Sequence, residues 1–197
     1  MVNNGGFILY NSNSKLRVII ICGIFAAITA ILAQIEIPIP IVPISGQTLA
    51  VGLTATIIGS RYGAIAMICY ALLGATGLPV FAGFKGGVQV LIGPTGGYIF
   101  GFILAAYVTG LILEKTKFTI TMAMIANTIG MIITLAFGAT QLKFVLDMTW
   151  GQALVTGVYP FIVVGLIKAY LASWLGITVR KRLIQAKLVP QTNKQVA

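Results

Sequence analysis

The sequence contains no histidine and only three acidic residues, Glu36, Glu114 and Asp147. The absence of histidine removes the commonest metal ligand and the usual general base near neutral pH. Three scattered carboxylates also form neither an acid pair for catalysis nor a network suited to proton coupling. These shortages argue against an intramembrane enzyme, and the sequence predicts no catalytic residue, no metal site and no cofactor.

Two further shortages narrow the chemistry. No stretch matches G-x-x-x-x-G-K-[ST], so the chain does not hydrolyse nucleotides by that motif. If the protein transports a solute, we expect the energy to come from another protein. The only cysteines, Cys22 and Cys69, lie in separate apolar runs, and we expect buried thiols rather than a disulfide.

Apolar residues dominate what remains. Of the 197 residues, 58% are hydrophobic and 8% are charged, whereas soluble domains carry about 25% charged residues. The sequence therefore predicts one integral-membrane domain over residues 1–197, of all-α class with six transmembrane helices. The apolar runs that define these helices are residues 16–35, 46–60, 62–78, 95–113, 118–138 and 153–178.

The two ends of the chain are predicted to lie outside the bundle. Residues 1–14 are polar and small and are expected to be loose, or in part an amphipathic lead-in, and residues 179–197 form a basic tail. Lys15 and Arg17 precede an apolar run of about 18 residues, which is longer than the 7–15 residues of a signal-peptide core. We therefore expect this run to be a retained span.

The basic residues are distributed unevenly between the two sides of the predicted bundle. With six spans, ten of them fall on the side that holds both termini, only Lys85 and Lys143 fall on the other, and Lys168 remains inside a span. The positive-inside rule then places both termini in the cytoplasm of a cell (plasma) membrane protein. This asymmetry explains the net charge of +10 without invoking nucleic acid.

Three long connections fall on the outer side. "EIPIPIVPISGQ" holds three prolines and is expected to be extended. "GLPVFAGFKGGVQVLIGPTGG" and "GATQLKFVLDMTWGQ" are the other two. Apolar, irregular backbone at a membrane must be buried or line a cavity, because lipid cannot satisfy its amide groups. We therefore expect a binding site that opens outward beneath these loops.

Several polar or small residues have both a structural and a functional interpretation. In "GPTGGY" (93–98), Thr95 is either a helix N-cap or part of a ligand-binding turn. Ser45 is a second candidate N-cap, and Asn127 is suited to an interhelical hydrogen bond. Small residues repeat along the first helix and form a face for either internal packing or another subunit: Gly23, Ala26, Ala30 and Ala33.

Lys168 is the most informative single residue. A charge deep in an apolar helix is costly and usually faces a partner or a cavity. Glu114 is predicted at the cytoplasmic end, so among the three acids Asp147 is the alternative partner to an anionic ligand.

Four stretches resemble, in this order, signatures of the BioY family: "PISGQTLAVGL", "GATGLPVFAG", "GPTGGYIFGF" and "GVYPFIVVGLIKAYLA". This family comprises the biotin-specific substrate-binding (S) components of energy-coupling factor (ECF) transporters. The resemblance covers residues 20–178, and the combination of the second and third stretches is its specific part. The family pattern usually places an acid three residues before the lysine, where this chain has Gly165.

The resemblance implies a high-affinity biotin-binding subunit that captures biotin from outside and works with a transmembrane coupling protein and two cytoplasmic ATPase subunits. The resemblance also favours the second interpretation of the small-residue face of the first helix, namely that it docks the coupling protein. A self-sufficient secondary transporter for a small anion is the alternative function.

Biotin combines an apolar bicyclic body, a polar ureido group and a carboxylate, so its site needs apolar walls, a few hydrogen-bonding groups and one cation. Lys168 is favoured over Lys85 as the partner of the carboxylate. The predicted ligand-binding residues are Gln47, Thr48, Tyr70, Phe81, Phe84, Lys85, Gly93, Pro94, Thr95, Gly96, Gly97, Tyr98, Asn127, Asp147, Trp150 and Lys168.

Overall fold

The computed structural model describes residues 5–186, with side chains from Leu16 onward. The described part of the chain is mostly helical, as the sequence predicts. The first half contains α1 (Gly5–Ala33), β1 (Glu36–Ile37), β2 (Ile44–Ser45), α2 (Gln47–Ile58), α3 (Ser60–Ala75), the 3₁₀ turn η1 (Ala82–Phe84) and α4 (Val88–Ile92). The second half contains α5 (Gly96–Lys115), α6 (Ile120–Val145), α7 (Trp150–Gly157) and α8 (Tyr159–Gln185).

The first five predicted apolar runs each form one helix, whereas the sixth, residues 153–178, is divided at Val158 between the end of α7 and α8. Four of those described are long and apolar enough to cross a membrane, and they are the Leu16–Ala33 part of α1, α5, α6 and α8. The other two, α2 and α3, have only 12 and 16 residues. Helix is the expected form for such runs, because it satisfies every interior backbone group within one segment.

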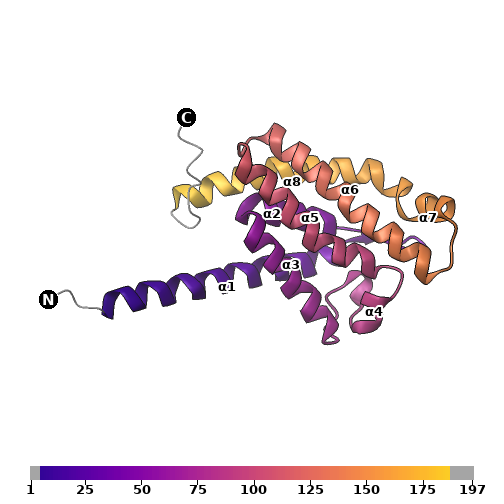
Figure 1. Cartoon of the computed structure of the whole chain (residues 1–197), viewed down its shortest axis with the longest axis horizontal. Coiled ribbons are helices and arrows are strands. Elements are labelled where there is room, and N and C mark those ends of the chain that lie inside the picture. The colour runs from indigo at the N-terminus through magenta and orange to yellow at the C-terminus, as the bar shows by residue number, and fades with distance from the viewer. Residues whose placement is uncertain (1–4, 187–197) are drawn as a thin grey trace.

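The helices form a bundle around α5. Helix α5 packs against α2, α3 and α6, and α8 closes the bundle against α2 and α6. Figure 1 shows the start of α1 and the end of α8 at one end of the bundle and α4 and α7 at the other, with α1 reaching well beyond its neighbours. The turns that carry the predicted cytoplasmic charges and the loops predicted to be external thus lie at opposite ends.

The helices extend beyond the predicted apolar runs in three places. Residues 5–14, expected to be loose or in part an amphipathic lead-in, belong to α1. The connection expected over "GATQLKFVLDMTWGQ" is mostly helix, because α6 continues to Val145 and α7 begins at Trp150. A capping box between Thr149 and Gln152 starts α7. Helix α8 continues through residues 179–185 of the predicted basic tail. Residues 1–4 and 187–197, with Lys187 and Lys194, lie outside the described residues.

The proline-rich connection between α1 and α2 is extended, as predicted. Its ends pair as the short antiparallel ladder of β1 and β2, in which Glu36 lies opposite Ser45 and Ile37 opposite Ile44. Ser45 is not the N-cap of α2 as the sequence suggested, because Gly46 holds that position. This hairpin lies directly over the start of α2.

A sharp corner joins α2 and α3 at the end that holds the termini. Gly59 has φ of +85°, a conformation that glycine adopts without strain. The Glu114 carboxylate accepts hydrogen bonds from the backbone N–H and the hydroxyl of Ser60, at 2.8 and 2.7 Å. Arg180 donates to the Ile57 carbonyl and lies over the Phe118 ring. An acid at the start of α3 and a base at the end of α2 both complement the helix dipoles.

Candidate functional site

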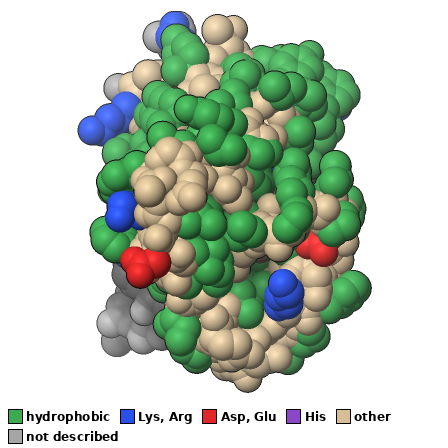
Figure 2. All heavy atoms as spheres, turned by 90° about the vertical axis from the view of Figure 1, so that its right-hand side faces the viewer, with side chains coloured by type: hydrophobic (Ala, Val, Ile, Leu, Met, Phe, Trp, Pro, Cys, Tyr) green, Lys and Arg blue, Asp and Glu red, His purple; other side chains and the backbone are tan. Residues whose placement is uncertain are grey.

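A cavity of about 70 Å³ lies near the α4/α7 end of the bundle. Figure 2 looks onto that end and shows mostly hydrophobic side chains with only a few charged ones. The cavity is walled by the β1–β2 hairpin, the start of α2, the 76–87 loop and the facing sides of α5, α6 and α8. Its lining residues are Val42, Pro43, Ile44, Ser45, Gln47, Thr48, Phe81, Ala82, Lys85, Val90, Thr95, Tyr98, Ile99, Phe102, Met131, Thr134, Leu135, Phe161, Val164, Gly165 and Lys168.

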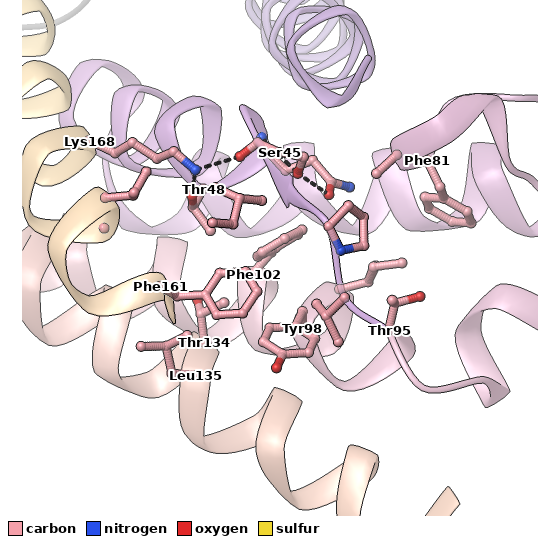
Figure 3. A pocket seen from close by; sticks show the side chains of 18 of the residues that line it. Ser45, Thr48, Phe81, Thr95, Tyr98, Phe102, Thr134, Leu135, Phe161 and Lys168 are labelled. Carbon is pink, nitrogen blue, oxygen red and sulfur yellow. Dashed lines mark hydrogen bonds between the residues drawn. The ribbon is translucent and has the colours of Figure 1, made fainter. Parts of the chain in front are cut away.

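Lys168 supplies a positive charge at the α8 wall of this cavity. Its ammonium donates hydrogen bonds to the Ser45 carbonyl at 2.7 Å and to the Thr48 hydroxyl at 3.4 Å (Figure 3). An ammonium has three donors, so these two bonds leave one available to a ligand. No carboxylate lines the described part of the cavity. The site therefore presents an oriented cation within a largely apolar wall.

Aromatic rings from two helices form another part of the cavity wall. Phe161 and Phe102 project from α8 and α5, and Tyr98 lies beside them (Figure 3). The Tyr98 and Phe161 rings are 6.0 Å apart and tilted by 36°. Tyr98 is fixed by its hydroxyl, which donates to the Gly157 carbonyl at 2.7 Å. Such rigid, flat surfaces suit an apolar ring system.

Polar groups for a ligand come mainly from α2 and its hairpin. Gln47 is buried at the start of α2, where its amide oxygen accepts from the Ser45 hydroxyl at 2.7 Å. Its amide nitrogen donates to the Tyr70 hydroxyl at 2.6 Å. Tyr70 thus lies behind Gln47 and does not line the cavity itself, although the sequence placed it in a wall.

The "GPTGGY" turn reaches the cavity through only two of its residues, Thr95 and Tyr98. Thr95 is the N-cap residue of α5 but makes no side-chain capping bond. Gly96 and Gly97 serve close packing: a Cβ on them would lie 1.7 Å from the Leu91 carbonyl oxygen and 2.4 Å from that of Phe137. The turn is also held from α6, where the Gln141 amide donates to the Leu91 and Gly93 carbonyls at 2.8 and 2.7 Å.

A smaller cavity of about 30 Å³ lies next to the first and shares Thr48, Met131, Thr134, Gly165 and Lys168 with it. Asn127, placed in the site by the sequence, lines this second cavity instead. Its amide nitrogen donates to the hydroxyls of Thr56 and Ser173, at 3.2 and 3.1 Å. It thereby joins α2, α6 and α8, which is the interhelical role that the sequence also allowed.

Several predicted residues lie outside the cavity. Phe84 is 71% exposed. Asp147 is exposed in the α6–α7 turn with φ of +55°. Trp150 is exposed at the start of α7, where the Lys143 ammonium lies 5.4 Å from its ring. None of these three side chains reaches the cavity lining, and Asp147 is not the partner of Lys168.

The small-residue face of α1 is largely occupied within the chain. Ala26 and Ala33 are fully buried and Ala30 is partly buried, whereas Gly23 is exposed with nothing near its missing Cβ. Internal packing therefore accounts for Ala26 and Ala33, and docking of another subunit on this face of α1 stays a prediction.

The sequence-based prediction missed most of the apolar wall, including Phe102, Met131, Thr134 and Phe161. One available signal was the helical period: positions 161, 164, 165 and 168 repeat at the spacing of one helix face. Counting back from Lys168 would have placed Phe161 beside the lysine. The same spacing was available on the other two helices, because Phe102 lies four residues after Tyr98 on α5, and Met131 and Thr134 lie four and seven residues after Asn127 on α6.

Fold and site together define a class: a multi-pass membrane protein with a ligand cavity between its helices and beneath irregular loops at one end. Within this class the chain belongs to the BioY family, whose model matches residues 10–185.

Two relatives and one solved structure show how similar this chain is to known proteins. It is 44% identical over 84% of its length to "Biotin transporter BioY" of Thermotoga maritima, covering 97% of that protein. It is 39% identical over 87% of its length to "Biotin transporter BioY2" of Lactococcus lactis, covering 94% of that protein. A crystal structure of the S-component for biotin from an ECF-type ABC transporter superposes with a TM-score of 0.77, at 27% identity, over 86% of this chain and 93% of that one.

Proposed function

We propose that this chain is the biotin-binding subunit of an ECF-type importer, and that it captures biotin in the cavity above Lys168. The observation that carries the proposal is the oriented Lys168 ammonium in an apolar, aromatic cavity with no carboxylate among its described lining residues. Membership of the BioY family and relatives named as biotin transporters support the choice of ligand.

The proposed ligand pose follows from the distribution of polar and apolar groups. The bicyclic body packs against Tyr98, Phe102 and Phe161, which line one side. The carboxylate pairs with Lys168, whose two protein hydrogen bonds hold the ammonium in place before the ligand arrives. Preorganisation of this kind reduces the entropy cost of binding. Exclusion of water strengthens the attraction between the two charges.

The ureido group needs both donors and acceptors. Gln47, Thr48 and Thr134 line the cavity within reach of a bound ligand, and we propose them as its partners. Lys85 lines the rim on the 76–87 loop and is exposed. It therefore attracts the anion on entry and is the second candidate partner for the carboxylate.

The proposed arrangement in the membrane has six spans, with α2 and α3 as the short ones and both termini in the cytoplasm of the cell that imports biotin. The location of the start of α1 and the end of α8 at one end of the bundle supports it (Figure 1). The α4/α7 end then faces outside, and the 76–87 loop acts as a lid. A transmembrane coupling protein and two ATPase subunits provide the energy, in agreement with the absence of a P-loop motif from the sequence.

Titration of purified protein with biotin tests the proposal most directly. Calorimetry should show saturable binding of biotin at or below micromolar concentration. A medium-chain fatty acid, which has the carboxylate but no ureido ring, should not bind. Absence of saturable binding would overturn the proposal. Biotin uptake by this chain alone, in cells without ATPase subunits, would instead favour a self-sufficient secondary transporter.

A further inference from the structure

We propose that Gln47 and Tyr70 are positioning residues that tie Lys168 to the 76–87 loop, so that the contacts orienting the binding lysine also hold this loop over the cavity. The inference rests on the proposed binding role of the cavity and adds a mechanism for how occupancy and loop closure are coupled. We call the set Lys168, Ser45, Gln47, Tyr70 and Val80 the polar strap.

Hydrogen bonds connect the strap from one end to the other. The Lys168 ammonium donates to the Ser45 carbonyl at 2.7 Å, and the Ser45 hydroxyl donates to the Gln47 amide oxygen at 2.7 Å. The Gln47 amide nitrogen donates to the Tyr70 hydroxyl at 2.6 Å, and that hydroxyl donates to the Val80 carbonyl at 2.9 Å. The strap thus joins three helices, α2, α3 and α8, to the β1–β2 hairpin and the 76–87 loop.

These hydrogen bonds lie in the protein interior, where breaking one of them is costly in free energy. Ser45, Gln47 and Tyr70 are all buried, and Tyr70 is fully so. When a buried polar group loses its partner, the loss of folding free energy exceeds the net contribution of the hydrogen bond, because water cannot replace the partner. Side-chain amides and hydroxyls also align along such a network and strengthen one another in a low-dielectric interior. The strap therefore favours a state in which all its members are in place.

At the loop end of the strap, the Phe81 side chain packs against α3. Val80 is followed by Phe81, whose ring meets the Tyr70 ring edge-on at a centroid distance of 5.5 Å. A Cβ on Gly74 would lie 2.0 Å from the Phe81 ring, so the ring sits directly on the α3 backbone. Phe81 is 1% exposed and also lines the cavity. A shift of the loop would thus move a cavity wall.

A second attachment joins the same loop to α1. The Gln34 amide nitrogen donates to the Phe81 carbonyl at 3.2 Å, and its amide oxygen accepts from the Phe84 backbone N–H at 2.9 Å. Gln34 immediately precedes the hairpin in which Glu36 pairs with Ser45. The hairpin is therefore linked to the loop through both Gln34 and Gln47, while Ser45 links it to Lys168.

Coupling between ligand and loop follows by reciprocity. A ligand that keeps Lys168 in place stabilises the strap and the closed loop, and a closed loop holds Lys168 ready for the ligand. Breaking the strap in its middle should release the loop and speed ligand dissociation, while the cavity lining stays intact.

Tyr70→Phe tests this most cleanly, because it keeps the ring contact with Phe81 and removes only the hydroxyl. A spin label at Val88→Cys, an exposed position in α4, reports loop mobility in a background with Cys22→Ala and Cys69→Ala. We expect higher label mobility without ligand, and a biotin dissociation rate raised by about three- to tenfold. Gln47→Met is the second variant and should also raise label mobility without ligand; because Gln47 lines the cavity as well, its biotin dissociation rate combines the loss of the strap with the loss of a proposed ligand contact.

Thr54→Val is the matched control, since Thr54 is fully buried, bonds only the Ala50 carbonyl of its own helix and lines neither cavity. It should leave label mobility and dissociation rate unchanged. Unchanged mobility and dissociation in both strap variants would overturn the inference, as would an equal change in the control. If the parent protein binds no biotin, the proposed function fails, yet the mobility comparison still decides whether the strap holds the loop.

Discussion

The ammonium of Lys168 donates a hydrogen bond to the carbonyl of Ser45, 123 residues away in the sequence, over 2.7 Å. This bond joins the middle of the last helix to the hairpin before α2. It satisfies a partly buried cation with a neutral acceptor, and no carboxylate stands among the described lining residues of the cavity, so the positive charge remains available to an anion. Asp147, the acid that the sequence offered as a partner, lies exposed in the α6–α7 turn.

Replacing Lys168 with Met should lower biotin affinity by about 10- to 100-fold, because a charged hydrogen bond contributes about 1.5–3 kcal/mol. Calorimetry with biotin measures the loss. Biotin amide, which lacks the negative charge, should bind the parent protein more weakly than biotin and should bind Lys168→Met about as well as biotin does. Lys143→Met, which changes a lysine outside the cavity, is the control. Equal binding of biotin and its amide to the parent would remove Lys168 as the carboxylate partner.

Replacing Asn127 with Leu should destabilise the bundle by about 1–2 kcal/mol, since the hydroxyls of Thr56 and Ser173 lose their shared donor. Thermal unfolding in detergent gives the change. A double-mutant cycle with Ser173→Ala should show non-additivity, because the two residues are in contact. Strict additivity would mean that the bond between them contributes nothing to stability.

Replacing Gly74 with Ala should destabilise the protein by about 1–3 kcal/mol, because the added methyl would overlap the Phe81 ring in a closely packed site. The displaced ring should also increase proteolysis of the 76–87 loop. Gly151→Ala is the control: it lies in α7 with nothing within 4 Å of its missing Cβ, and alanine favours helix there. A loss of stability in the control as large as in Gly74→Ala would contradict the packing argument.

The six-span arrangement predicts opposite accessibility for the two ends of the bundle. In a background without native cysteines, Val155→Cys in α7 should react with a membrane-impermeant maleimide added to intact cells. Lys117→Cys, between α5 and α6, should react only after the membrane is permeabilised. Both positions are exposed in the structure. Labelling of Lys117→Cys in intact cells would contradict cytoplasmic termini.

The sequence by itself determined that the chain is helical and membrane-embedded, because long apolar runs leave the backbone no other way to satisfy its hydrogen bonds. It also singled out Lys168, since a charge in an apolar run requires a compensating environment. A break was expected at Arg61, between the runs 46–60 and 62–78, whereas the corner lies at Gly59, where Glu114 accepts hydrogen bonds from Ser60.

Tertiary structure decided which residues surround the lysine. Phe102, Thr134 and Phe161 resemble many other residues of their helices, and only packing determines that their side faces the cavity. Packing also determines that Ala26 and Ala33 face the interior, and that Ser45 contacts Lys168 although the two residues are far apart in the sequence. Contacts between distant segments depend on how helices rotate and cross, and apolar runs that are hydrophobic on every side carry little information about that rotation.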